Sequence, residues 1–525
     1  MISWVIPITG HTPLQLKLNS NAKIIVTMKT IKYYLIFSVL FAFLLTGCES
    51  LEVKNENDPD FATAFSNPSD VRGVASSLIN AWFQITQEYN GPALALWVGA
   101  DAGTCSWGNA AMRDFSYEPR IAWDNTPSYG NAIITENYYK TLYSILSSAN
   151  EVAGKIKKDG MVITTEGKDE TQMVLAVAHL AQGLTLGYVG LLFDKAFVVT
   201  ESTDLTAAVP VSGYKAIIDT AVACLDKCIA ICSSKTFTLP STWVPGIEMT
   251  NTKLGELANT VAGLLLSYSP RNKTDNDAVN WTKVLGYAQK GLTYDFAPVM
   301  DDVNWYTGYH TYANFSGWGM TDMRIVNMMD SRFPSRWVDA NTWNILPAPT
   351  TSHTAGIDDR IFTDFKYMSS CGFKVERGYY HFSCYRFKRR DQYLSTWKEP
   401  APVFYKAEND LLKAEALLKK SGPDLAGAAA IINSGTRVTR GGLAPVSANA
   451  SEIEAAIFHE RNIELFCSGL GVEFFTMRKA DKLQKGTPLH FPIPGQQLQV
   501  NMMDYYTFGK DQGVAGKDYS NGGWF

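Results

Sequence analysis

The sequence predicts a mainly α fold whose helices form tetratricopeptide-like hairpin pairs. Apolar residues recur with a helical period through most of the chain after residue 65, and Ala, Gly and Trp stand where neighbouring helices would come close. Between residues 296 and 401 this period stops, and Gly, Asn, Asp, Trp and Tyr dominate. A clean repeat of about 34 residues is missing, so the scaffold is expected to be repeat-like.

The first part of the chain has the pattern of an export signal. Two lysines precede an apolar run from Tyr33 to Leu45, which is shorter than the roughly 20 residues that span a bilayer. The run ends in Leu-Thr-Gly-Cys, which resembles the bacterial lipobox, so Cys48 is expected to carry lipid and to hold the protein at a membrane. The alternative is an ordinary cleaved signal with an incidental cysteine. Met28 is the expected start, because Met1 would place the signal far from the N-terminus.

These patterns divide the chain into a leader with signal peptide at 1–47, an acidic flexible tether at 48–64 and a single domain at 65–525. Loss of the leader's four lysines takes the formal net charge from −4 to −8. An acidic body argues against nucleic acid as a partner, because binding to phosphates needs clustered Lys and Arg.

The predicted domain alternates between helical and irregular parts. A helical scaffold is expected over about 65–295 and 402–470, with a loop-rich ligand region at 296–401 and an irregular tail at 471–525. Short strands are expected in the loop-rich region, for example at 381–387, where polar and apolar residues partly alternate. The predicted helices are 70–87, 137–157, 171–193, 213–233, 254–267, 277–292, 404–420, 425–433 and 451–466.

Two local patterns concern these helices. Ser451, with Glu454 three residues later, is typical of a capping box at a helix start. Cys224, Cys228 and Cys232 recur at every fourth position on one helix face without His or carboxylate neighbours. We therefore interpret them as small buried apolar residues and not as a metal site.

Several segments of the second half occur together in a recognisable order. Glu460-Arg-Asn-Ile-Glu-Leu-Phe-Cys-Ser-Gly469 is followed by Glu473-Phe-Phe-Thr-Met-Arg478, Pro492-Ile-Pro494 and Asn501, and is preceded by Lys413-Ala-Glu-Ala416. With the lipobox, these segments resemble the SusD-like (RagB/SusD) family of outer-membrane nutrient-binding lipoproteins. The resemblance implies a SusD-like α superhelical fold over nearly all of the mature chain.

The charged residues of this pattern have a physical interpretation of their own. Glu460, Arg461 and Glu464 lie within one helical turn, so Arg461 can pair with a carboxylate and direct its donors towards Arg478–Asp481. We interpret the group as structural, and a catalytic role for Glu460 or Glu464 as the weaker alternative.

The resemblance implies a binding protein and not an enzyme. Relatives hold an oligosaccharide, or in some cases a peptide, at the cell surface and sit over a TonB-dependent SusC-like transporter of the outer membrane. The expected partners are therefore this transporter, an oligosaccharide ligand and the membrane that holds the lipid anchor. The alternatives are a peptide-binding or purely structural accessory of the transporter and, less favoured, a surface glycoside hydrolase.

Sugars need aromatic rings to stack on and planar polar groups for hydrogen bonds. Two loop stretches supply both, around residues 97–113 and 301–318. For any single aromatic side chain in these stretches, packing in the core is the commoner role. We nevertheless expect at least two of the five aromatic candidates to contact ligand. The candidate ligand-binding residues are Asp101, Trp107, Asn109, Arg113, Trp305, Tyr306, Tyr309 and Trp318.

Signals for catalysis are poor. The sequence contains no HExxH, Gly-x-Ser-x-Gly or P-loop motif, and its seven histidines have no metal-binding spacing. No cofactor or metal is expected, although Asp301-Asp302 and Asp358-Asp359 leave structural calcium open. Sequence alone also leaves open a pair of carboxylates placed for glycoside hydrolysis.

Overall fold

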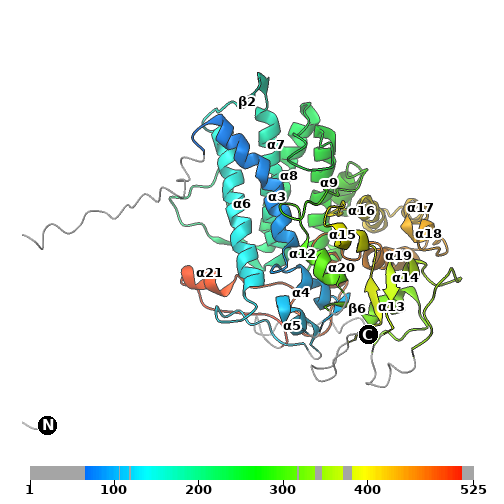
Figure 1. Ribbon diagram of the computed structural model, residues 1–525. Coiled ribbons are helices and arrows are strands. Elements are labelled where there is room, and N and C mark those ends of the chain that lie inside the picture. Colours follow the sequence, from blue (N-terminus) through cyan, green and yellow to red (C-terminus); the bar gives the residue numbers. More distant parts are fainter. Residues whose placement is uncertain are drawn as a thin grey trace, which may run out of the picture. The chain divides into compact units, whose positions relative to one another are not determined.

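Helices dominate the computed structural model, as the sequence predicts (Figure 1). The structure describes residues 65–105, 107–117, 120–315, 318–336, 346–369 and 381–510. The predicted leader, the tether and the lipidation site at Cys48 lie outside the described residues. Residues 62–525 form one compact unit by their internal contacts.

The first part of the scaffold is a series of long helices that pack on their neighbours in sequence, α6 on α7, α7 on α8 and α8 on α9 (Figure 1). Each long helix overlaps a predicted helix. The bounds are α3 Pro68–Gln87, α4 Ala93–Gly99, η1 Asn109–Ala111, α5 Met112–Ser116, α6 Ile133–Lys157, α7 Thr171–Leu192, α8 Tyr214–Ser234, α9 Asn251–Tyr268, α10 Lys273–Asp277 and α11 Trp281–Ala288.

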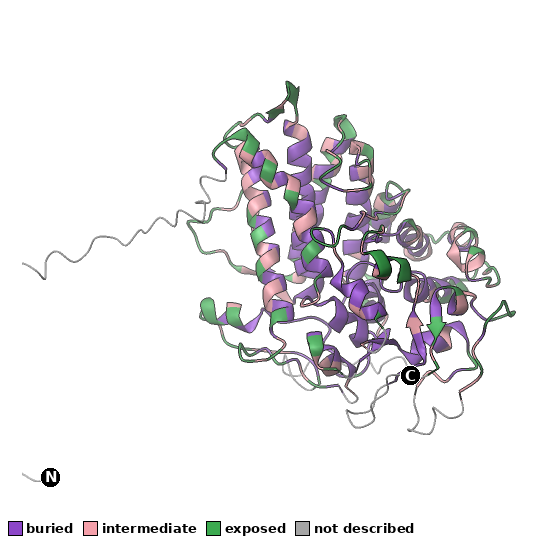
Figure 2. Ribbon diagram, in the orientation of Figure 1, coloured by how far each residue is buried: buried purple, intermediate pink, exposed green. Residues whose placement is uncertain are grey.

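Helix α7 lies at the centre of this series. Within the described residues it is the one helix long and apolar enough to cross a membrane, but its apolar window is wholly buried among the other helices (Figure 2). A Cβ at Gly183 would lie 2.4 Å from Leu225 Cγ, and one at Gly187 would lie 2.5 Å from Leu265 Cδ1. The glycines of this helix therefore let α8 and α9 approach closely, as the Ala and Gly pattern predicts.

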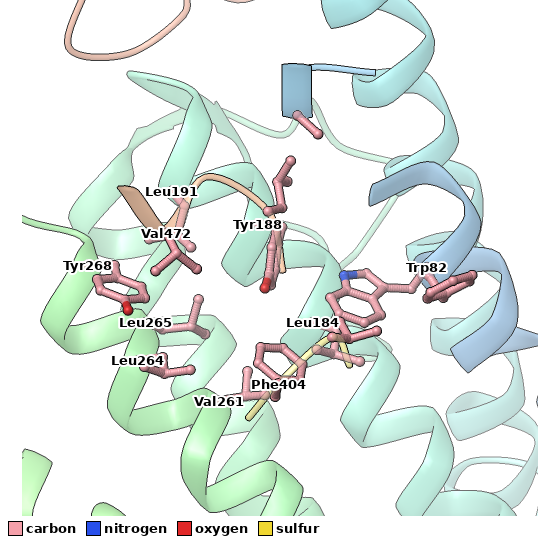
Figure 3. Close-up of a cluster of buried hydrophobic side chains, with 14 of the residues drawn as sticks. Trp82, Leu184, Tyr188, Leu191, Val261, Leu264, Leu265, Tyr268, Phe404 and Val472 are labelled. Carbon is pink, nitrogen blue, oxygen red and sulfur yellow. The ribbon is translucent and has the colours of Figure 1, made fainter. Parts of the chain in front are cut away.

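The core continues between α3, α7, α9 and residues near 404 and 472 (Figure 3). The Trp82 ring stacks on Phe404 at a centroid distance of 6.0 Å and meets Tyr188 edge-on at 5.1 Å. Trp82 is 1% exposed. Because Phe404 comes from the second half of the chain, this packing joins the two helical parts.

The second part contains shorter elements. In its described residues, the predicted loop-rich region holds four short helices, which have too few turns for a clear apolar period. It also holds the antiparallel pair β7–β8 and the strand β6, which pairs with β1 from the first part of the chain. Of the predicted strand at 381–387, the last three residues are present as β8. The bounds are α12 Gly308–Asn314, α13 Met323–Met329, α14 Arg360–Thr363, α15 Asp391–Thr396, α16 Lys406–Lys419, α17 Leu425–Ser434, α18 Thr436–Thr439, α19 Ala450–Ile463, α20 Val472–Lys479 and α21 Gly495–Val500; the strands are β1 Gly103–Thr104, β2 Thr164–Thr165, β3 Lys168–Asp169, β4 Lys195–Phe197, β5 Val211–Gly213, β6 Met320–Thr321, β7 Phe365–Tyr367 and β8 Tyr385–Phe387.

The start of α19 corrects one prediction. Asn449, not Ser451, is the N-cap, and its side chain accepts hydrogen bonds from the backbone N–H groups of Ser451 and Glu452. Glu454 pairs with Lys419 at 3.2 Å instead of closing a capping box. Asn is as good an N-cap as Ser, so α19 can begin two residues before the predicted cap.

The three cysteines of α8 are buried, as the spacing predicts. Cys228 Sγ and Cys232 Sγ lie 4.0 Å apart as free thiols. Burial raises the pKa of Cys224 to about 11, so this thiol stays protonated and behaves as a small apolar side chain.

Candidate functional site

The candidate site is built around the short helix α12. Thr307 is its N-cap: Thr307 Oγ1 accepts from His310 N at 3.1 Å and donates to Gln87 Oε1 at the end of α3, 2.9 Å away. Thr307 N donates to Tyr393 Oη of α15 at 3.0 Å. Two elements distant in sequence, α3 and α15, thereby fix where α12 begins.

A close backbone contact brings a further loop against the same helix. A Cβ on Gly308 would lie 2.8 Å from Tyr89 N and 3.2 Å from Tyr89 Cβ. Only glycine at this position lets the loop after α3 lie directly on the first turn of α12. The contact places the Tyr89 ring beside the side chains that α12 carries.

Five partly exposed aromatic side chains surround α12, and we call them the aromatic platform: Tyr89, Tyr306, Tyr312, Trp318 and Trp397. Tyr89 and Tyr312 have ring centroids 4.1 Å apart, and Tyr312 and Trp318 are 4.9 Å apart. Tyr306 and Trp397 form a second pair, with ring centroids 5.8 Å apart. Partly exposed rings that already contact one another form a surface on which a ligand with apolar faces can stack.

Polar and further apolar groups border the platform. The Asn109 side chain hydrogen-bonds to Tyr89, which opposes the rise in the pKa of Tyr89 that burial causes. Trp107, two residues before Asn109, is 41% exposed, and Phe315, which follows α12, is 47% exposed. Among the described residues, these two belong to the small set of large hydrophobic side chains that face solvent.

Three of the predicted ligand-binding residues are buried, which corrects their proposed role as surface contacts. Trp305 is 4% exposed and packs on Phe83 at a centroid distance of 4.8 Å, and Tyr309 is 1% exposed. Asp101 is 4% exposed and pairs with Arg120 at 2.6 Å. Trp305 and Tyr309 lie beside or in α12, whose residues other than Tyr312 are buried, so both pack in the core beneath the platform. Asp101 follows α4 and lies in the interior with its partner Arg120.

The other predicted residues remain accessible. Trp107 and Asn109 are exposed, and Tyr306 and Trp318 are partly exposed. The structure brings Asn109, Tyr306 and Trp318 to the platform through the contacts given above. Arg113 is half-exposed, with its guanidinium 5.7 Å from the Tyr117 ring and 3.7 Å from an Asp114 oxygen.

The predicted set of residues omits three members of the platform, Tyr89, Tyr312 and Trp397. Tyr312 lies in the predicted stretch around residues 301–318, whereas Tyr89 and Trp397 belong to separate loops. Trp397 has φ +58, a left-handed conformation that is unfavourable for a bulky residue. Asp302, Ala110 and Ala111 near the platform also have positive φ. Such strain often gathers at binding sites, but it is visible only in the folded backbone.

His310 does not add an acid or base to the site. It is 1% exposed and packs between Tyr309 and Tyr393, with ring centroids 5.7 Å and 6.4 Å away. Burial lowers the pKa of His310 to about 3, with a further contribution from the nearby Arg390 cation. The imidazole is therefore neutral at physiological pH and part of the core of this region.

The carboxylate pairs noted in the sequence bind donors within the protein. Asp301 Oδ1 accepts from the backbone N–H groups of Val303, Asn304 and Trp305 at 2.7–2.9 Å. Asp358 pairs through both oxygens with Arg360, at 2.7 and 2.9 Å. Asp358, His459 and Glu460 could together hold a cation, but the Arg360 guanidinium already occupies the position between the two carboxylates.

The Glu-Arg-x-x-Glu segment is structural in its contacts. Glu460 and Glu464 are 1% and 2% exposed and both bind Arg360. Arg461 pairs with Glu415 at 2.8 Å, and Glu415 also binds Lys479 at 2.7 Å. The predicted connection between α19 and the segment at 478–481 is therefore indirect, because Arg461 and Lys479 both bind Glu415 of α16.

Comparison with known proteins gives a result at the level of structure only. No family model matches the sequence, and no curated protein matches it. A SusD superfamily protein from Parabacteroides distasonis has 14% identity and a TM-score of 0.58, covering 83% of this chain and 97% of that chain. A SusD-like carbohydrate-binding protein from Bacteroides fragilis has 14% identity and a TM-score of 0.58, covering 87% and 97%. A SusD homolog from Bacteroides uniformis has 15% identity and a TM-score of 0.52, covering 84% and 94%. The fold is that of the SusD superfamily, so the predicted resemblance is confirmed for the fold.

Proposed function

We propose that this protein binds an oligosaccharide on the aromatic platform at the cell surface and delivers it to a TonB-dependent SusC-like transporter in the outer membrane. The observation that carries the proposal is the group of contacting, partly exposed rings around α12. A sugar ring presents C–H faces that stack on such rings and hydroxyl groups that hydrogen-bond at their edges. Asn109 and the hydroxyl of Tyr306 supply polar atoms at the border of the platform.

Three carboxylates that the sequence singled out, Glu460, Glu464 and Asp301, give the hydrolase alternative little support. Glycoside hydrolysis needs two carboxyl groups that reach the glycosidic bond from either side. Glu460 and Glu464 are buried under arginines, and Asp301 binds backbone N–H groups. Retention without turnover is therefore the behaviour we propose for a polysaccharide ligand.

The fold supports the binding role indirectly. The Bacteroides fragilis neighbour is described as a carbohydrate-binding protein. For this chain, the lipobox at Cys48 and the resemblance of the Glu460–Gly469 segment support a place at the outer membrane beside a transporter.

Affinity electrophoresis against a panel of neutral and acidic glycans tests the binding role. We expect at least one glycan to retard the protein, and we expect Trp318→Ala and Tyr312→Ala to remove most of that retardation. Tyr505→Ala is the control, because Tyr505 is 51% exposed and is not a platform residue. If these variants lose binding together with a large fall in melting temperature, the two residues are structural and the proposal is contradicted. If peptides retard the protein and no glycan does, the peptide-binding alternative is favoured.

The membrane location has its own test. Cys48→Ser is expected to move the protein from the outer-membrane fraction to the soluble fraction and to abolish labelling by a clickable fatty acid. A variant protein that stays in the membrane fraction with labelling unchanged would contradict the lipid anchor at Cys48.

A further inference from the structure

A cavity of about 490 Å³ opens between α16, α17, α18 and the C-terminal end of α19. None of the aromatic platform residues lines it. Its volume lies within the range of about 300–1,000 Å³ that is typical of small-molecule sites. The cavity is therefore large enough for a ligand and separate from the site described above.

Two glutamates, Glu460 and Glu464, form the acidic floor of this cavity, and other residues of the protein neutralise their charge. Glu460 binds both guanidinium nitrogens of Arg360, at 2.6 and 2.8 Å, and accepts from Thr436 Oγ1 at 2.8 Å. Glu464 pairs with Arg389 at 3.0 Å and also binds Arg440. These carboxylates have no need of a further cation, so the floor does not favour a positively charged ligand.

Arg437 is the exception among the arginines that line the cavity. Its side chain is partly buried, its Nε has no hydrogen-bond partner, and no ion pair joins it to another residue in the described ranges. Burial lowers the pKa of Arg437, with Glu460 and Arg360 acting in opposite directions. An arginine nevertheless remains charged at neutral pH, so the cavity holds a guanidinium without its own counter-ion.

Two further carboxylates line the cavity, and both have a partner in Lys406: its side chain pairs with Asp410, and its backbone N–H donates to Asp295 at 2.8 Å. Other parts of the lining suit a sugar ring. Leu411, Ile431 and Ile432 supply apolar surface, and the hydroxyls of Ser434, Thr436 and Thr439 have lone pairs that can accept from a ligand. A planar guanidinium binds a carboxylate through two parallel hydrogen bonds. We propose that this cavity binds a hexuronate, free or at the end of an acidic glycan, with its carboxylate on Arg437. The inference concerns a different site from the aromatic platform and stands independently of the function proposed for it.

Isothermal titration of the full mature protein with sodium D-glucuronate and with D-glucose tests this inference. We expect glucuronate to bind and glucose to bind at least about tenfold more weakly, because the charge-assisted pair is absent. Arg437→Gln should weaken glucuronate binding by about tenfold or more. Lys290→Gln, at an exposed lysine of the α11 end, should leave it unchanged.

The outcomes separate the two sites. Trp318→Ala should leave glucuronate binding intact, and Arg437→Gln should leave neutral glycan binding at the platform intact. Equal affinity for glucose and glucuronate, no glucuronate binding, or binding that Arg437→Gln does not change would each overturn the inference. Because Arg437 has no ion pair to lose, the melting temperature of the Arg437→Gln variant should match that of the wild type. Chemical-shift changes at Thr436 and Thr439 on addition of glucuronate provide a readout independent of affinity. Titration with an acidic oligosaccharide that ends in a uronate shows which ligand the cavity suits. Tighter binding than that of glucuronate indicates a glycan end, and equal or weaker binding indicates the free sugar.

Discussion

Thr307 Oγ1 donates a hydrogen bond to Gln87 Oε1 across 220 residues of sequence, in the interior of the protein. The same hydroxyl caps α12, and Gln87 Nε2 continues the connection to Gly469 O at 3.3 Å. Thr307 is 0% exposed, so neither water nor a surface side chain can replace it. The position of the aromatic platform therefore depends on a buried polar contact between α3 and α12.

Thr307→Val removes the hydroxyl while keeping the shape of the side chain. We expect a loss of roughly 1–3 kcal/mol in the free energy of unfolding, because Gln87 Oε1 and the His310 N–H lose their buried partner. Glycan affinity should fall as well, because the start of α12 is released. Urea denaturation and affinity electrophoresis measure the two effects.

The control for this change is Thr185→Val in α7, whose hydroxyl donates to Ala181 O within the same helix. It should alter stability without changing glycan affinity. Unchanged binding in Thr307→Val would show that the platform does not depend on this contact.

Trp305→Ala tests whether this residue belongs to the core. We expect a loss of about 3–5 kcal/mol in stability, since a buried ring that packs on Phe83 is replaced by a cavity. Trp318→Ala, at a partly exposed ring, should cost much less stability and far more glycan affinity. Thermal unfolding of both variants compares them directly, and equal melting temperatures would refute this assignment of the two tryptophans.

Arg360→Met is expected to destabilise the protein by roughly 3–5 kcal/mol, because it leaves Asp358, Glu460 and Glu464 buried without their shared cation. Lys273→Met is the matched control, since its pair with Asp277 is exposed and should contribute about 0–1 kcal/mol. Chemical denaturation at pH 7 measures both. A small effect at Arg360 would mean that the network relaxes or takes up water.

Glu473 should make stability depend on pH. Burial raises the pKa of Glu473 to about 7, against the opposing hydrogen bond from Cys467 N at 2.9 Å. Between about pH 4.5 and 7 the folded state holds a proton that the unfolded state has lost, so this contribution to stability falls as pH rises through that window.

Glu473→Gln keeps an acceptor for Cys467 N and removes the titration. We expect the variant to gain on the order of 2 kcal/mol relative to wild type between pH 4.5 and 7.5. Glu248→Gln, at an exposed residue, should follow the wild type throughout. Urea denaturation at a series of pH values makes the comparison, and parallel curves for Glu473→Gln and wild type would contradict the raised pKa.

Local patterns were enough to predict the long helices, whereas the SusD-like fold was implied by the resemblance of the Glu460–Gly469 segment and its neighbours. Apolar periodicity in α3, α6, α7, α8 and α9 depends only on neighbouring residues, so it can be recognised without knowing what each helix contacts. The close-contact glycines of α7 could also be anticipated from composition. The short helices of the irregular region could not, because four to seven residues hold too few turns to show a period.

The binding surface required the folded structure. The sequence determined that aromatic and polar residues gather in two loops, because composition is a local property. Whether Trp305 or Trp318 faces solvent depends largely on Phe83 and Tyr89, which reach these residues from a distant segment. Burial is a property of all neighbours in space, and only tertiary packing decides which ring becomes core and which remains available to a ligand.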